Sequence, residues 1–169
     1  MKGPERVDPP YIADERPMLE GWLEYHRATL LTKSEGLDRD QLITASCPPS
    51  DLNLLGLVRH MAEVERNWFR NVLAAEGAPP LYYDEDVDPD GDLHPPDDVD
   101  VDADIATFLA ECDRARELAA GHSLDDTGTT RRGDVVSLRG ILVHMIEEYA
   151  RHNGHADLIR ERIDGATGE

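Results

Sequence analysis

The sequence predicts an all-α protein, an antiparallel four-helix bundle in which one connection is a long loop. Three observations favour this fold class. Apolar residues recur at steps of three and four in several long segments, no segment shows a convincing strand pattern, and an acidic, proline-rich stretch separates the second helical segment from the third. The chain of 169 residues fits a single domain over 1–169.

The first predicted helix follows an N-terminal arm at residues 1–12, where prolines oppose regular structure. Asp14 is a candidate N-cap for this helix, and Gly36 supplies a stop. A short helical turn is expected at residues 38–42.

The second predicted helix has the clearest pattern in the chain. Ser50 or Asp51 can cap it, and Gly77 can end it. Its apolar stripe comprises Leu54, Leu57, Met61, Val64, Trp68 and Val72. His60 lies beside this stripe, so its imidazole is expected to point toward the core.

Two more helices are expected after an acidic crossover loop at residues 78–103, which contains five prolines. The third should cover residues 104–120, and the stretch TGTTRRGD after it is expected to be a polar loop. Ser137 can cap the fourth helix, which should end before Gly165. Its buried seam comprises Leu138, Ile141, Met145, Glu148, His152, either His155 or Ala156, Ile159 and Ile163.

Charge and composition narrow the classes of partner. The formal net charge of -19 at pH 7 opposes binding to nucleic acid or to anionic membranes. No apolar run approaches the roughly 20 residues that cross a bilayer, and the first residues lack the apolar stretch of a signal peptide, so we expect a cytoplasmic protein. Cys47 and Cys112 lie far apart without CxxC spacing, and we expect ordinary thiols.

Two polar residues interrupt the seam of the fourth helix, Glu148 and His152, one turn apart on the same face. A buried carboxylate needs a compensating partner, and a divalent metal ion is one. His60 would supply a third ligand from the second helix, because bundle cores often hold metals through inward-facing Glu and His. The alternative that needs no metal is a hydrogen-bonded Glu–His pair beside a core histidine.

Two imidazoles and one carboxylate are the ligand set of catalytic zinc centres, which keep one coordination position open. The same set also suits iron, and nickel or manganese are further alternatives. His144, His155 and Glu147 lie near these ligands along the helix and are candidates to hydrogen-bond them; His144 is also a candidate fourth ligand.

The segments GLVRHMAEVERNWF and SLRGILVHMIEEYARHNGHADLIRERIDG resemble the two signature helices of the DinB/YfiT-like superfamily of metal-dependent four-helix bundles. The resemblance covers nearly the whole chain and implies a metal bound by His60, Glu148 and His152. The common pattern has histidine where this chain has Glu148. A glutamate there is similar to the branch that contains the metal domain of mycothiol-dependent maleylpyruvate isomerase.

This resemblance implies a metal-dependent transferase or isomerase that activates a low-molecular-weight thiol such as mycothiol, or else a water, at the open position. Its partners would be the thiol and an electrophilic substrate, with a homodimer as a further expectation. A substrate clamp would come from Arg59, Arg66 or Arg151, or from a second subunit, because no C-terminal domain follows the fourth helix here. The alternatives are a non-catalytic bundle with a structural ion and a metal-assisted hydrolase.

The crossover loop contains two further candidates. The stretch DVDPDGDLHPPD at residues 86–97 resembles a calcium-binding loop, but its prolines and the absence of flanking helices favour a solvated acidic loop. Tyr82 and Tyr83 are candidates to contact a ligand.

Overall fold

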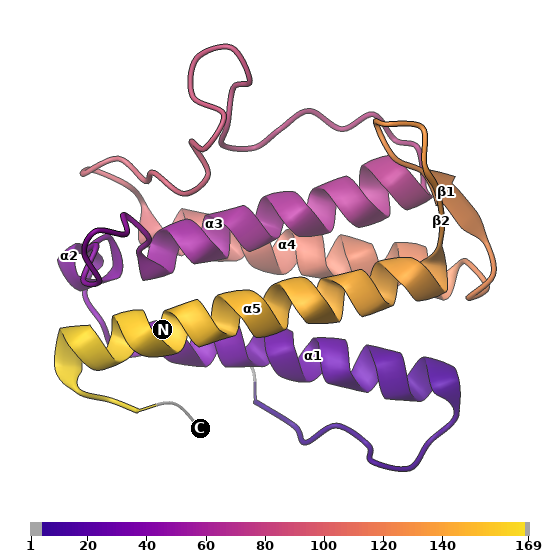
Figure 1. The fold of residues 1–169 in the computed structure, drawn as a ribbon, viewed down its shortest axis with the longest axis horizontal. Coiled ribbons are helices and arrows are strands. Elements are labelled where there is room, and N and C mark those ends of the chain that lie inside the picture. Colours follow the sequence, from indigo (N-terminus) through magenta and orange to yellow (C-terminus); the bar gives the residue numbers. More distant parts are fainter. Residues whose placement is uncertain (1–4, 168–169) are drawn as a thin grey trace.

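The computed structural model describes residues 5–167, so the first four residues of the expected arm lie outside the described part. The protein is mostly helical, and its long helices lie side by side (Figure 1). They are α1 (Glu15–Ser34), α3 (Leu54–Glu65), α4 (Val101–Ala120) and α5 (Leu138–Asp164). A short helix, α2 (Arg39–Leu42), follows α1, and α3 continues directly into the π-helix η1 (Arg66–Leu73). No helix within residues 5–167 is both long and apolar enough to cross a membrane.

Asn53, rather than Ser50 or Asp51, is the N-cap of α3. Its side chain accepts a hydrogen bond of 2.8 Å from the backbone N–H of Gly56, which satisfies one of the free donors at the start of the helix. The expected cap was therefore wrong by two or three residues, because Asn is as good a cap as Ser or Asp and all three types occur within residues 50–53.

The starts of the last two long helices also depend on capping side chains. Asp100 caps α4 by accepting a 3.1 Å hydrogen bond from Ala103, so this helix begins three residues before the expected position. The expected cap of α5 is confirmed, because the Ser137 hydroxyl accepts from the Gly140 N–H. Gly165 ends α5 in the left-handed conformation, with φ of 79°.

A small β-hairpin replaces the polar loop expected between the third and fourth helices. Strands β1 (Thr127–Thr129) and β2 (Val135–Ser137) pair antiparallel. Each strand has three residues, which is too short to produce a visible alternation pattern in the sequence. A Cβ atom at Gly128 would lie 2.0 Å from the Val72 carbonyl oxygen, so a glycine is needed where β1 packs against η1.

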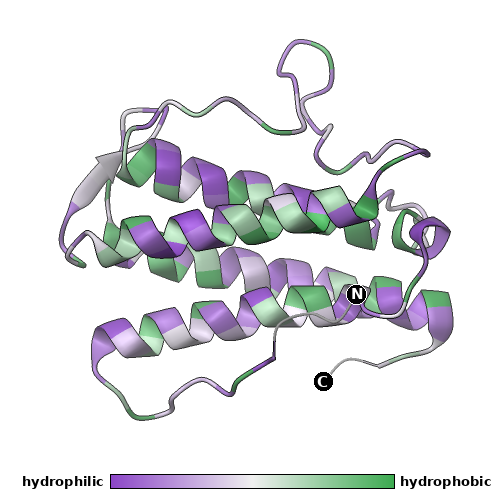
Figure 2. Ribbon diagram, turned by 180° about the vertical axis from the view of Figure 1, so that it is seen from behind, coloured by the Kyte–Doolittle hydropathy of each residue, from purple (hydrophilic) through white to green (hydrophobic). Residues whose placement is uncertain are grey.

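The apolar stripes predicted for α3 and α5 face the core. Along each helix hydrophobic and hydrophilic residues alternate, as expected for helices with one buried face (Figure 2). Several predicted seam residues are fully buried, namely Leu54, Leu57, Met61, Leu138, Ile141, Met145 and Ala156. These side chains form one continuous cluster with apolar residues of α1 and α4, such as Leu30 and Phe108.

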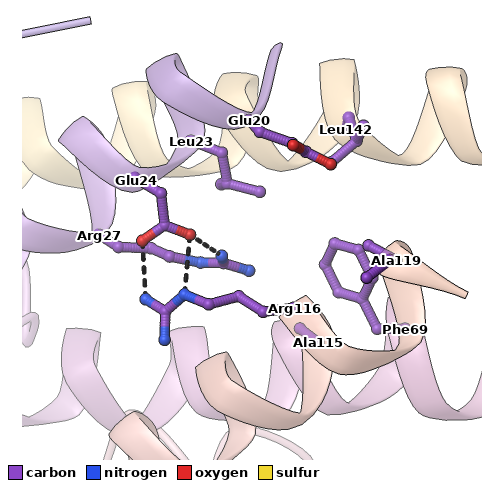
Figure 3. A pocket seen from close by; sticks show the side chains of 10 residues that line it. Glu20, Leu23, Glu24, Arg27, Phe69, Ala115, Arg116, Ala119 and Leu142 are labelled. Carbon is purple, nitrogen blue, oxygen red and sulfur yellow. Dashed lines mark hydrogen bonds and ion pairs between the residues drawn. The ribbon is translucent and has the colours of Figure 1, made fainter. Parts of the chain in front are cut away.

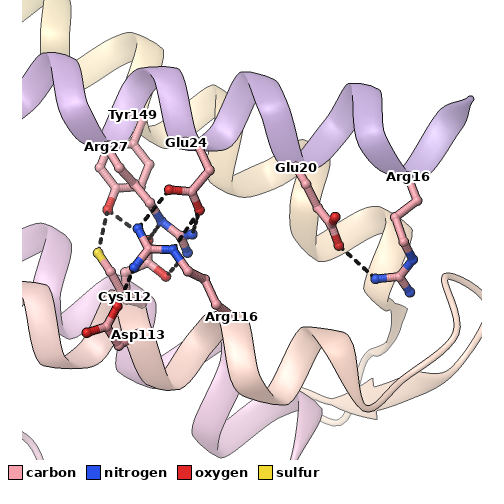
Figure 4. A network of polar contacts seen from close by, with 9 residues as sticks. Arg16, Glu20, Glu24, Arg27, Cys112, Asp113, Arg116 and Tyr149 are labelled. Carbon is pink, nitrogen blue, oxygen red and sulfur yellow. Dashed lines mark hydrogen bonds and ion pairs between the residues drawn. The ribbon is translucent and has the colours of Figure 1, made fainter. Parts of the chain in front are cut away.

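A buried polar cluster crosses this core. The Arg27 guanidinium donates two hydrogen bonds, of 2.7 and 2.5 Å, to the carboxylate of Glu65, and both side chains are buried. The Tyr149 hydroxyl donates to the same carboxylate at 2.8 Å. Tyr149 and Arg27 lie close together in this cluster (Figure 4). Burial alone would lower the pKa of Arg27, but the Glu65 carboxylate raises this pKa well above its ordinary value, so the pair stays charged.

Cys112 lies at the edge of this cluster, with its sulfur 3.9 Å from the Tyr149 hydroxyl oxygen. Burial raises the pKa of the Cys112 thiol well above its ordinary range. A buried thiol that resists deprotonation is a poor nucleophile, which agrees with the ordinary role expected for this cysteine.

Candidate metal centre

The structure brings the predicted ligands His60, Glu148 and His152 together from two facing helices. One nitrogen or oxygen atom from each lies within 4.8 Å of the others, and the two imidazole rings have their centroids 4.8 Å apart. His60 belongs to α3, whereas the other two residues lie one turn apart on α5. Their side chains are 25, 15 and 12% exposed respectively, so the group is half-buried and can be reached from solvent.

The packing of α3 against α5 explains this meeting. Met61 and Met145 are fully buried beside the ligands in the sequence, and they belong to the same apolar cluster. Because these neighbours fix the rotation of both helices, His60 and Glu148 emerge at the rim of the shared core.

Asp92, from the crossover loop, makes the closest polar contact with the group. One of its carboxylate oxygens lies 2.8 Å from Nδ1 of His60, and the carboxylate is 9% exposed. An ionised carboxylate only accepts hydrogen bonds, so Nδ1 carries the proton and Nε2 keeps the lone pair that a metal needs. The sequence analysis missed Asp92, since it is one of many acidic residues in an aperiodic loop.

The loop around Asp92 is fixed to α3 through its backbone. The Asn53 amide donates to the Leu93 carbonyl at 3.2 Å, and the Arg59 guanidinium donates to the Gly91 carbonyl at 3.0 Å. A Cβ atom at Gly56 would lie 2.5 Å from the Leu93 oxygen, so a side chain at this position of α3 would clash with the loop. The expectation of a solvated acidic loop is therefore wrong at Gly91 and Asp92, which are buried.

The calcium-loop resemblance at residues 86–97 finds no counterpart in the described residues. The acidic side chains of this loop do not converge into a group of three that could hold an ion within residues 5–167. One of them, Asp92, turns instead toward His60, and Asp88 approaches the imidazole of His94 at 3.5 Å.

Replacing Asp92 with alanine is expected to weaken zinc binding by about tenfold to a hundredfold, because His60 loses the partner that orients its ring. Gly56→Ala should also weaken zinc binding, because its Cβ atom would clash with the Leu93 carbonyl and displace the loop that carries Asp92 from α3. A zinc titration against a chelating dye measures both. Asp90→Ala is the matched control, because Asp90 lies two residues from Asp92 and is exposed. Equal zinc affinities for Asp92→Ala and Asp90→Ala would contradict the role assigned to Asp92.

His152 has a neutral imidazole over most of the accessible pH range. Burial, together with the neighbouring imidazoles of His60 and His155, lowers its pKa to about 4. Its Nδ1 lies 3.4 Å from Nδ1 of His155, whereas Nε2 lies 3.4 Å from the Glu148 carboxylate. Neutral imidazole is the form that binds a metal, so this ring is ready to act as a ligand at pH 7.

This depressed pKa predicts a pH dependence for the metal-free protein. Between about pH 6.5 and about 4, the unfolded chain binds a proton at His152 that the folded chain does not. Protonation then favours unfolding, so stability should fall as pH drops through this window. Thermal melts of chelator-treated protein at several pH values check this, and the decline should be shallower for His152→Gln than for the parent.

His144 joins a second group next to the first. Its two ring nitrogens lie 3.8 Å from Glu147 and 3.7 Å from Glu148, and its ring contacts Trp68 at a tilt of 52°, with centroids 4.4 Å apart. Glu148 therefore belongs to both groups, whereas His144 is not part of the group formed with His60. That His144 is a fourth ligand stays a prediction.

The three arginines considered as a substrate clamp have different surroundings. Arg59 is buried under the loop, with its guanidinium carbon 4.2 Å from the centre of the Tyr82 ring. Arg66 donates to the Pro79 carbonyl and pairs with Glu111 on α4. Arg151 is 54% exposed and lies 3.4 Å from the Glu148 carboxylate. Arg59 and Arg66 thus stabilise the loop, and Arg151 is the accessible cation beside the candidate centre.

Tyr82 is also occupied within the fold. Burial raises the pKa of its hydroxyl to about 12, and its backbone N–H donates to the buried carboxylate of Glu63 at 2.7 Å. These contacts make it a packing residue of the crossover loop. Tyr83 is less buried and lines a cavity of 430 Å³ together with residues such as Arg66 and Asn71.

The donor set fits one small divalent ion. Zinc bonds of about 2.0 to 2.2 Å in tetrahedral geometry keep two ligand atoms about 3.4 Å apart. The observed distance between His152 Nε2 and the nearer Glu148 oxygen is 3.4 Å. The hydrogen bond to Asp92 leaves Nε2 of His60 free for the same ion. The ligand types of the three residues, and the spacing of Glu148 and His152, therefore suit a small divalent ion.

Comparison with known protein families gives a match over most of the chain. No curated protein matches the chain. The family model for mycothiol S-transferases matches residues 18–165, which span α1 to α5 and include His60, Asp92, Glu148 and His152. Because this match covers most of the chain, the protein belongs to the mycothiol S-transferase family, within the DinB/YfiT-like superfamily.

Proposed function

We propose that this protein is a metal-dependent transferase that activates mycothiol at a zinc ion held by His60, Glu148 and His152, in an antiparallel four-helix bundle. The observation that carries the proposal is the half-buried group of two imidazoles and one carboxylate, which supplies three ligands and leaves a further coordination position for an exogenous one. The family match supplies the class of thiol.

A zinc ion bound here would act as a Lewis acid that lowers the pKa of a thiol at its free position. The residues of the chain prepare that position. Asp92 fixes the ring of His60, and burial keeps His152 neutral. Glu148 contributes one negative charge, which offsets half of the charge of a divalent ion.

The reaction itself is a transfer of sulfur to an electrophilic carbon. The thiol releases its proton to solvent, its sulfur forms a new bond to the electrophile, and the leaving group departs with the bonding electrons. Arg151 is exposed beside Glu148, so it can bind an anionic leaving group or substrate carboxylate. The family match favours transfer over the isomerase and hydrolase alternatives.

A purely structural ion is the alternative that the geometry opposes. Structural zinc sites are usually closed by four protein ligands and are shielded from solvent. Here the group that includes His60 has three members, and the His60 side chain is 25% exposed. Three protein ligands with this exposure favour an open coordination position over a closed structural one.

Titration of cobalt-substituted protein with mycothiol tests the proposal. Binding of the sulfur should produce a sulfur-to-cobalt charge-transfer band that saturates with thiol concentration. The matched control is the analogue in which a hydroxyl replaces the thiol, which should bind without that band. Zinc-loaded protein should then accelerate conjugation of mycothiol to an aryl halide. A saturating titration that leaves the cobalt spectrum unchanged would reject thiol activation.

A further inference from the structure

A cavity lies at the side of the molecule away from the candidate metal centre. Helix α1 packs closely on α5, and α3 on α4, whereas α1 and α4 stand further apart. The cavity between them has a volume of 390 Å³ (Figure 3). Its apolar wall is formed by Leu23, Phe69, Ala115, Ala119 and Leu142. None of the proposed metal ligands lines it.

The polar edge of this cavity binds a carboxylate, that of Glu24. One oxygen of Glu24 accepts hydrogen bonds from Arg27 at 2.6 Å and from Arg116 at 2.9 Å. The other oxygen accepts from Arg116 at 2.7 Å, so two guanidinium groups from different helices donate to one carboxylate (Figures 3 and 4). The chain thereby displays a receptor for a carboxylate at the edge of an apolar cavity.

Glu24 can be displaced at low cost. Its side chain is 43% exposed and can turn toward solvent. Arg27 would keep its buried partner Glu65, and Arg116 would keep Asp113. An external carboxylate could therefore replace Glu24 without leaving a buried charge unpaired, which is the main penalty in binding a charged group.

The space beside this receptor has the size of a small ligand. Small-molecule sites usually measure about 300 to 1,000 Å³ and combine an apolar wall with a few polar groups. A second cavity of 220 Å³ shares Glu24, Arg27 and Arg116 and is lined also by Val7 of the N-terminal arm. The cluster of Glu24, Arg27 and Arg116 thus lies between two cavities. The larger, of 390 Å³, has more room for the apolar part of a ligand.

We propose that this cavity is a binding site for a small organic carboxylate with a compact apolar body. The carboxylate takes the place of Glu24 between Arg27 and Arg116, and the apolar body lies against Leu23, Phe69 and Leu142. This site is separate from the proposed mycothiol site, so its occupancy does not depend on a metal.

Binding of 4-phenylbutyrate to the metal-loaded protein tests the proposal by calorimetry, with backbone amide NMR to locate the site. We expect saturable binding and shifts at Leu23 and Ala115. Glu24→Gln removes the competing charge and should tighten binding by about tenfold, whereas Arg116→Gln should weaken it by about tenfold. Ala119→Leu narrows the cavity and should also weaken binding, through shape rather than charge.

The neutral probe 4-phenylbutanol is the matched control for the carboxylate. It should bind the parent protein more weakly than 4-phenylbutyrate and should not respond to Glu24→Gln. Equal affinities for the two probes would overturn the proposal, as would an absence of saturable binding to both the parent and Glu24→Gln. Metal content and the cobalt spectrum should stay unchanged in all three variants, which separates this result from any failure of the proposed transferase function.

Discussion

The double substitution of His60 and His152 by alanine is expected to abolish stoichiometric metal binding. The two residues supply both imidazoles of the group, and Glu148 alone cannot retain a transition metal at micromolar concentration. The loss of affinity should exceed the tenfold to hundredfold change typical for an orienting partner such as Asp92. Elemental analysis of tag-free protein measures the result, with a stoichiometric amount of zinc, nickel or iron expected in the parent.

A histidine outside the group provides the control. His122 lies at the end of α4, where its Nδ1 contacts the Leu118 carbonyl, and His122→Gln should retain the parental metal content. The transferase rate should follow the metal, falling to the uncatalysed rate in the double variant and staying unchanged in His122→Gln. Absence of metal from the parent even after reconstitution would contradict the centre and leave these residues as a polar group at the rim of the core.

The second large effect is expected at the buried pair of Arg27 and Glu65. Glu65→Gln removes the buried counter-charge of Arg27 and leaves only the half-exposed Glu24 beside the guanidinium. Loss of one partner of a buried pair typically costs about 3 to 5 kcal/mol of folding free energy. The Glu65 side chain is completely buried and receives three hydrogen bonds, two from Arg27 and one from Tyr149, so no solvent replaces the lost charge. For a chain of this length the melting temperature should fall by about 10 °C.

Glu24→Gln is the matched control for this prediction, because it removes the other carboxylate that pairs with Arg27. Its side chain is 43% exposed, and exposed ion pairs contribute about 1 kcal/mol or less. Urea unfolding of both variants, with the metal removed from each, measures the difference. Equal stability losses would show that the Arg27 charge is neutralised by another group.

The proximity of the three proposed ligands could be predicted from sequence because they lie on helices with a strong hydrophobic periodicity. Once the seam of α5 was placed by residues such as Met145 and Ile141, the inward direction of Glu148 and His152 followed from helical geometry. Asp92 could not be found in this way. Its position depends on where the crossover loop rests on α3, and this is decided by long-range contacts to Asn53 and Arg59.

The buried ion pair escaped prediction for a different reason. A pattern based on hydrophobicity assigns charged residues to the solvent face, so Arg27 on α1 and Glu65 at the end of α3 resemble surface positions. They can be buried because their charges neutralise each other across the core. A pairing between residues of two different helices does not change the hydrophobic periodicity of either helix, so that periodicity could not predict it. The helices were thus easier to place than the polar contacts between them.

The attachment of the crossover loop has a consequence for how this protein can diversify. Asn53 and Arg59 hold the loop through the carbonyl oxygens of Leu93 and Gly91, and a carbonyl is present whatever the side chain. Exposed positions of the loop can therefore exchange residues freely while Asp92 keeps its place beside His60. If His60 is a metal ligand as proposed, variation in this segment would offer directed evolution a route to new substrate preferences that leaves the proposed metal centre unchanged.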